Sequence, residues 1–98
     1  MKPGSTFVSE PIEPDVDTMD PERIARGEPD APRAFLWRGV RYEVARLERS
    51  WRTYKTDRGE RYVDRHWFEL GLRGGEVVRL YCMRRERGAS RWFLFSIS

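Results

Sequence analysis

Apolar and polar residues alternate along the last two thirds of the chain, which is the pattern of half-buried β-strands. Val40, Tyr42 and Val44 alternate with charged residues and predict one such strand. The apolar phase slips after Val44, so we expect a β-bulge near residues 45–46. Residues 54–60 are polar and predict a loop before the next strand.

Two adjacent glycines, Gly74 and Gly75, separate two runs of strand-forming residues. They predict a two-residue hairpin turn with positive φ at both positions. That register places Trp67, and not His66, directly across from Cys82. One face of the hairpin is then mostly apolar and is expected to be core: His66, Phe68, Leu70, Leu72, Val77, Arg79, Tyr81 and Met83. The other face is mixed and is expected to be partly covered: Trp67, Glu69, Gly71, Val78, Leu80 and Cys82.

The final segment, residues 92–97, is apolar on both faces near its start, which favours a central or barrel-closing strand. Together these segments predict a mainly β fold, a small curled antiparallel sheet or barrel of five to six strands. We place this basic, aromatic-rich β domain at residues 33–98.

Residues 1–32 form an acidic arm that contains several prolines and few apolar residues. A short extended segment is predicted at residues 7–12. Near residues 20–26, Asp20 suits an N-cap and Pro21 suits the first helical position, so we expect a helix of one or two turns. The rest of the arm is expected to be irregular, because it cannot bury enough surface to offset its ordering entropy.

Charge is distributed unevenly between these two parts. Residues 33–98 carry 16 Lys/Arg against 8 Asp/Glu, whereas residues 1–32 carry 3 against 8, and the whole chain has a formal net charge of +3. All but one of the aromatic residues lie in the basic part. Guanidinium groups beside aromatic rings suit a polyanion, so nucleic acid, DNA or RNA, is the first partner to consider. The acidic arm is either a solubilising tail or an intramolecular competitor for that ligand.

The chain carries no recognisable catalytic or metal-binding pattern. His66 and Cys82, the only histidine and the only cysteine, are too few for a zinc site, and we interpret both as structural. No glycine-rich phosphate loop precedes a helix, and the acidic residues are interleaved with arginines. We therefore expect neither enzyme activity nor a cofactor. One cysteine allows no internal disulfide, which fits a reducing cytoplasm, and no apolar run is long enough for a membrane span.

Two groups of residues are candidates for contacts with nucleic acid. The first is the basic turn that contains Arg84, Arg85, Arg87 and Arg91. Its side chains could straddle a phosphate backbone, or they could simply keep an exposed turn soluble. The second group consists of tryptophans beside arginines, on which bases could stack: Trp51 with Arg49 and Arg52, and Trp67 with Arg65. In so small a domain these tryptophans could instead belong to the core, to which we assign Trp37 and Trp92.

Several segments resemble a bacterial family of domains of unknown function. They are residues 7–13 (FVSEPIE), 35–39 (FLWRG) with 42–44 and 51–52, 65–70 (RHWFEL), 80–81 and 91–94 (RWFL). Members of that family occur as small stand-alone cytoplasmic proteins. They also form the C-terminal segment of ImuB-like proteins, the inactive Y-family polymerase homologues of bacterial mutagenesis cassettes. The resemblance implies a non-catalytic accessory module in DNA-damage tolerance. In one departure, the family's strand after the glycine turn usually ends in an acidic residue, where this chain has Cys82 and Met83.

Three functions are consistent with these features. The first is a module that binds nucleic acid through its arginine-rich face. The second is a protein-interaction module that docks on a polymerase or repair protein through an exposed sheet face around Trp67, Val78 and Leu80. The third is a structural domain whose partner is a copy of itself, and the sequence leaves the oligomeric state open.

Overall fold

The computed structural model of the chain describes residues 5–26, 30–57, 61–83 and 91–98. Of these, residues 24, 54–57 and 61–64 are described by their backbone alone. The elements in chain order are β1 (Thr6–Pro11), β2 (Glu13–Pro14), a 3-10 turn (Val16–Thr18), α1 (Pro21–Ala25), β3 (Ala34–Trp37), β4 (Val40–Asp57), β5 (Arg61–Leu72), β6 (Val77–Met83) and β7 (Arg91–Ile97).

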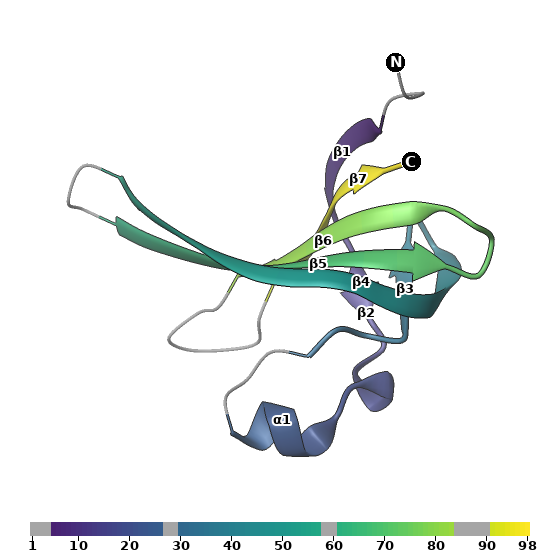
Figure 1. Cartoon of the computed structure of the whole chain (residues 1–98), viewed down its shortest axis with the longest axis horizontal. Helices are drawn as coiled ribbons and strands as arrows, with labels where there is room; N and C mark the ends of the chain where they lie inside the picture. Colours follow the sequence, from purple (N-terminus) through teal and green to yellow (C-terminus); the bar gives the residue numbers. More distant parts are fainter. Residues whose placement is uncertain (1–4, 27–29, 58–60, 84–90) are drawn as a thin grey trace.

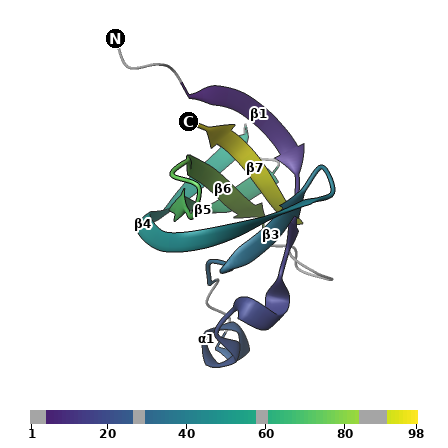
Figure 2. The same cartoon turned by 90° about the vertical axis from the view of Figure 1, so that its right-hand side faces the viewer.

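These strands form one antiparallel sheet in the order β1-β7-β6-β5-β4-β3-β2 (Figure 1). β1 and β2 lie at opposite edges of the sheet, although only Ile12 separates them in the sequence. The sheet therefore has to curl until its two edges approach each other. At that point the backbone N–H of Ile12 donates to the carbonyl oxygen of Trp92 at 3.1 Å. The result is an open half-barrel, seen from the side in Figure 2.

The mainly β, curled antiparallel fold is confirmed, but the predicted number of strands is wrong. The described residues form seven strands rather than five or six, because the arm contributes β1 and β2, which pair with β7 and β3. The extended segment expected at residues 7–12 corresponds to β1, and the helix expected near residues 20–26 corresponds to α1. Asp20 Oδ1 accepts a hydrogen bond from the N–H of Glu22 at 2.9 Å, as an N-cap does. The arm is thus more regular than predicted, while a domain boundary at residue 32 stays a prediction.

The hydrophobic core lies on the inner side of the curl. Its largest contribution comes from the neighbouring strands β5, β6 and β7, through Phe68, Leu70, Leu72, Val78, Leu80, Cys82, Trp92 and Leu94. Ile12, Met19 and Ala31 from the arm and Phe35 from β3 pack against the same cluster. Burial of these side chains offsets the ordering entropy that the arm could not offset alone. Figure 2 shows α1 at one end of the molecule, away from β1 and β7.

The predicted register of the β5–β6 hairpin is wrong by one residue. The turn spans three residues, since Leu72 N donates to Glu76 O at 2.8 Å and Gly75 N donates to Leu72 O at 3.0 Å. Of the two glycines, Gly75 has a positive φ of 97° and Gly74 does not. A three-residue turn that ends on a left-handed residue is a common alternative to the two-residue turn.

This slip exchanges the two faces of β6, because side chains alternate between faces with a period of two. Trp67 pairs with Tyr81, and His66 pairs with Cys82. Val78, Leu80 and Cys82 therefore point into the core, where Val78 and Leu80 are 0% exposed. Arg79 and Tyr81, which were expected on the core face, lie on the outer face.

The β4–β5 pair is longer than the sequence predicted. Strand pairing continues to Asp57 and Arg61, so residues 54–57 are strand and not loop. In Figure 1 this two-stranded ribbon extends well beyond the other strands. The bulge predicted near residues 45–46 is confirmed by a register shift between Val44 and Arg46.

Candidate functional site

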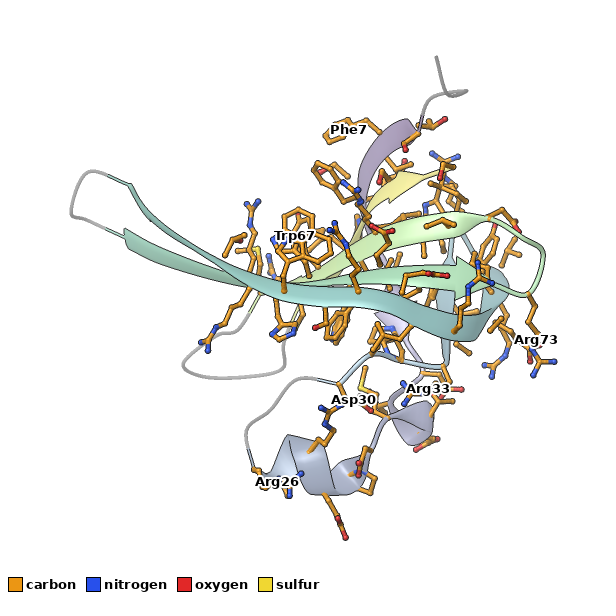
Figure 3. All side chains as sticks on the ribbon, viewed as in Figure 1. Phe7, Arg26, Asp30, Arg33, Trp67 and Arg73 are labelled. Atoms are coloured by element: carbon orange, nitrogen blue, oxygen red, sulfur yellow. The ribbon has the colours of Figure 1, made fainter. Side chains whose placement is uncertain are left out.

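A continuous row of aromatic side chains crosses the outer face of the sheet. It consists of Trp51 on β4, Trp67 on β5, Tyr81 on β6, Phe95 on β7 and Phe7 on β1, and we call these five residues the aromatic row. The ring centroids are 5.9 Å apart for Trp51 and Trp67 and 4.9 Å apart for Trp67 and Tyr81. Phe95 lies 5.0 Å from Trp67 and 5.1 Å from Phe7, with an edge-to-face geometry in both pairs. In Figure 3, Trp67 and Phe7 lie on the same side of the sheet, opposite Asp30 and Arg33.

Strand register and one bulge bring these rings together. Trp51, Trp67 and Tyr81 are direct cross-strand partners, so their side chains share a face. On the β6–β7 pair, Arg79 is opposite Ser96 and Leu80 is opposite Leu94. Phe93 is opposite Tyr81, so alternation along β7 places Phe95 on the outer face as well, beside Trp67 and Tyr81. The bulge follows, and it brings Ser96, the partner of Phe7, to the same face.

The row is partly open to solvent and firmly held. Phe7 is 67% exposed and Tyr81 is 7% exposed, while Trp51, Trp67 and Phe95 are half-buried. The indole N–H of Trp67 donates to Thr53 Oγ1 at 2.9 Å, which fixes the ring orientation. The rings thus present apolar surface to solvent without relying on loops for their position.

Three arginines lie beside the aromatic row. The guanidinium carbon of Arg49 is 4.7 Å from the Trp51 ring centroid, and that of Arg65 is 4.8 Å from the Tyr81 centroid. Arg79 approaches Trp51 at 5.9 Å. These distances are those of cation–π contacts. We call the aromatic row together with Arg49, Arg65 and Arg79 the outer face.

Glu69 partly neutralises this charge. Its Oε2 accepts from Arg79 Nε at 3.1 Å and lies 3.7 Å from an Arg49 guanidinium nitrogen. Arg65 differs, because its Nε is buried without a hydrogen-bond partner in the described part of the structure. Three cationic groups against one carboxylate leave the outer face with a modest positive charge.

The structure brings four of the predicted site residues together and separates others. The outer face contains Arg49, Trp51, Arg65 and Trp67. Arg49 lies over Trp51, as the sequence predicted, whereas Arg65 lies over Tyr81 and not over Trp67. Arg52 is in register with His66 and so lies on the opposite face. Arg91 is exposed at the start of β7. The remaining members of the basic turn, Arg84, Arg85 and Arg87, lie outside the described residues.

The interaction face predicted around Trp67, Val78 and Leu80 does not exist as one surface. Val78 and Leu80 are fully buried in the core, whereas Trp67 is on the other side of the sheet. The cause is the one-residue register slip. Because of the same slip, Arg79 and Tyr81 were predicted on the core face. A three-residue turn that ends at Gly75 would have placed them on the outer face. Phe95 shares the outer face with Phe93, the partner of Tyr81, and no register was predicted for this last strand.

Arginines elsewhere on the molecule are engaged by carboxylates, several of them from the arm. Arg38 pairs with Glu10 at 2.5 Å, Arg41 with Asp15 at 3.0 Å, and Arg23 with the buried Asp30 at 3.3 Å. Arg33 also approaches Asp30, and Arg73 pairs with Glu43 at 3.6 Å. The basic side chains that the structure describes therefore do not form one uninterrupted positive surface. Among the described residues, the ion pairs of the arm involve arginines other than those of the outer face.

Glu10 ties β1 to the hairpin between β3 and β4. Its Oε1 accepts from Arg38 Nε at 2.9 Å and from the indole N–H of Trp37 at 3.0 Å. These bonds, led by that from Arg38, lower the pKa of Glu10 to about 2. Arg38 and Gly39 have φ values of 53° and 75° in the tight turn that Glu10 contacts. A left-handed φ is costly for arginine, so the bidentate pair with Glu10 helps to hold Arg38 in this conformation.

His66 and Cys82 are direct neighbours, contrary to the predicted register. Ser50 Oγ is 2.7 Å from His66 Nε2, and the His66 ring stacks on Phe68 with a centroid distance of 4.7 Å. Cys82 is the single cysteine of the sequence, which excludes an internal disulfide, and it is only 3% exposed. In the described residues, no group of three His, Cys, Asp or Glu side chains could hold a metal ion. No helix in the same residues has the length and apolar character of a membrane span.

The sheet, the aromatic row and the arginines together define a small antiparallel β domain whose outer face combines aromatic rings with guanidinium groups. The chain belongs to a family described as a domain of unknown function (DUF6504), whose family model matches residues 1–98. No curated protein and no solved structure matches the chain.

Proposed function

We propose that this protein is a non-catalytic module that binds nucleic acid through the outer face. The observation that carries the proposal is the placement of Arg49, Arg65 and Arg79 beside a row of aromatic rings that crosses five strands. Rings of this kind accept bases by stacking, and guanidinium groups contact the phosphates between the bases. Because the rings and arginines project from strands, they are held in fixed positions relative to one another.

The composition of the outer face supports nucleic acid over a smaller anion. One base stacked on an aromatic side chain contributes roughly 1–3 kcal/mol, so several weak contacts in a row add to useful affinity. Each arginine that reaches a phosphate releases a counterion and makes binding depend on salt. Arg91, which is exposed at the start of β7, is a further cation available to the phosphates of the nucleic acid.

The resemblance to the C-terminal segment of ImuB-like proteins favours a context of bacterial DNA-damage tolerance. An accessory module in such a system would hold DNA near a polymerase without acting on it chemically. A single cysteine, which allows no internal disulfide, fits the reducing cytoplasm, where DNA-damage tolerance takes place.

A protein partner, such as a polymerase or another repair protein, is the second candidate. Phe7 is 67% exposed and extends the half-buried rings to the edge of the sheet. Such a partner would contact the aromatic row, since Val78 and Leu80 belong to the core. Its affinity would depend little on salt, which separates it from nucleic acid.

The proposal is tested by titrating fluorescent oligonucleotides with the protein at low and high salt. We expect Arg79→Ala to weaken binding and to reduce the salt slope by about one. Arg73→Ala is the matched control, because Arg73 is 72% exposed and pairs with Glu43 away from the aromatic row (Figure 3). Absence of binding at low salt, or equal losses in both variants, would overturn the proposal.

A further inference from the structure

We infer that the occupant of the outer face is single-stranded DNA, with its bases stacked against the aromatic row, and not a duplex. This inference rests on the proposed function and specifies its ligand. It follows from the direction of the row, from the exposure of Phe7 at its end and from the small net charge beside it.

The aromatic row runs across the strands and offers a path of suitable length. Trp51, Trp67, Phe95 and Phe7 follow one another at centroid distances of 5.9, 5.0 and 5.1 Å. The row reaches from β4 to β1, and because its rings lean together these three distances add up to a path of at most about 16 Å. One base on each of these four rings corresponds to a site of about four nucleotides.

The chemistry of the rings requires bases whose faces are free. In a duplex each base is already stacked and paired, so a protein surface reaches chiefly phosphates and groove edges. The rings of the outer face gain nothing from such contacts. Phe7, at 67% exposure, gives the path an open end on which an unstacked base can lie.

The charge of the outer face also favours a single strand. Glu69 engages both Arg49 and Arg79, so at most about three phosphates are neutralised, and fewer while Glu69 holds its partners. For a single strand the logarithmic salt slope is about −0.7 per phosphate, which predicts a slope of about −2 or shallower. Duplex-binding proteins that rely on phosphates use roughly six to ten contacts.

DNA is favoured over RNA because the path over the rings is apolar and the polar groups described beside it are already partly engaged. Thr53 Oγ1 accepts from Trp67, and Glu69 accepts from Arg79. Both groups keep some hydrogen-bonding capacity, but a ribose 2′-hydroxyl laid over the rings themselves meets apolar surface and loses water.

The test compares three ligands of equal length at low salt: oligodeoxythymidine, oligouridine and a blunt DNA duplex. We expect oligodeoxythymidine to bind most tightly. Phe7→Ala should weaken its binding by roughly 5-fold or more, the loss of one stacked base, and should leave duplex binding unchanged. Val16→Ala is the matched control, since Val16 is 64% exposed but lies in the 3-10 turn (Val16–Thr18) and not in the aromatic row. A melting curve of each variant confirms that it is folded.

The outcomes separate the inference from the proposed function. Equal affinity for single strand and duplex, both insensitive to Phe7→Ala, would overturn the inference and leave nucleic-acid binding intact. Tighter binding of oligouridine would overturn the assignment to DNA. Failure of all three ligands to bind would overturn both the inference and the proposed function, and would favour a protein as the occupant of the outer face.

Discussion

Trp51 of β4 and Trp67 of β5 are direct cross-strand partners, with ring planes inclined by 2° and centroids 5.9 Å apart. Their contact joins the long β4–β5 ribbon to the rest of the aromatic row, because Trp67 also touches Tyr81 and Phe95. The pair therefore has two roles: it stabilises the pairing of β4 with β5, and it takes part in the proposed stacking of bases.

The structural role of this pair is measurable without a ligand. In a double-mutant cycle of Trp51→Leu and Trp67→Leu, urea unfolding should give a coupling free energy of about 0.5–1.5 kcal/mol. Combining Trp51→Leu with Val16→Ala provides a control. These residues lie on separate elements, so their effects on the free energy of unfolding should be additive. Additivity of the two tryptophan substitutions would contradict the stacked geometry.

Replacement of Glu69 by Gln should tighten the binding of nucleic acid. The change removes the carboxylate that engages Arg49 and Arg79 and frees both for phosphates. One unit charge near 4 Å in water corresponds to about 1 kcal/mol, so we expect about a fivefold gain at low salt that shrinks at high salt. Glu43→Gln is the control, because it makes the same charge change beside Arg73. A gain of equal size in both variants would show that only net charge matters.

The corrected hairpin turn makes a prediction about two adjacent glycines. Gly75→Ala should destabilise the fold by about 1–2 kcal/mol, because Gly75 has a φ of 97°. Gly74→Ala should cost less, since a Cβ there meets mainly the flexible carboxylate of Glu76. Chemical denaturation of the two variants decides the matter. A two-residue turn would instead make both substitutions comparably costly.

Glu10 predicts a specific acid sensitivity. Its pKa is lowered to about 2 from an ordinary value of 4.5, so between these values the unfolded chain binds a proton that the folded chain does not. The contribution of Glu10 to stability is therefore complete above about pH 4.5 and is lost as the pH falls towards 2. Chemical denaturation at several pH values in this range gives the free energy of unfolding of wild type and of Glu10→Gln. The slope of this free energy against pH should be smaller in the variant, by up to the equivalent of about one bound proton. Parallel curves for the two proteins would contradict the bidentate pair with Arg38.

Much of the fold was accessible from local sequence signals. Alternation of apolar residues predicted the curled β architecture, the phase slip after Val44 predicted a bulge, and Asp20 with Pro21 predicted the short helix. β2 was not predictable in this way, because two residues become a strand only through pairing with β3. The closing of the curl through Ile12 likewise depends on contacts between distant segments.

The candidate site was predicted in part for a related reason. Trp51 with Arg49 and Trp67 with Arg65 were recognised as aromatic residues beside arginines, and they do share the outer face. A pair of glycines is compatible with turns of two or three residues, and the difference exchanges every side chain of β6 between core and surface. Tyr81 was consequently assigned to the wrong face.

The central claim is that bases stack on the outer face, and the indole N–H signals of the four tryptophans test it most directly. In a ¹H–¹⁵N titration with oligodeoxythymidine, the signals of Trp51 and Trp67 should shift with one common dissociation constant. Those of Trp37, bonded to Glu10, and of Trp92, buried in the core, should stay in place. Saturable binding that leaves the Trp51 and Trp67 signals unmoved would contradict the account.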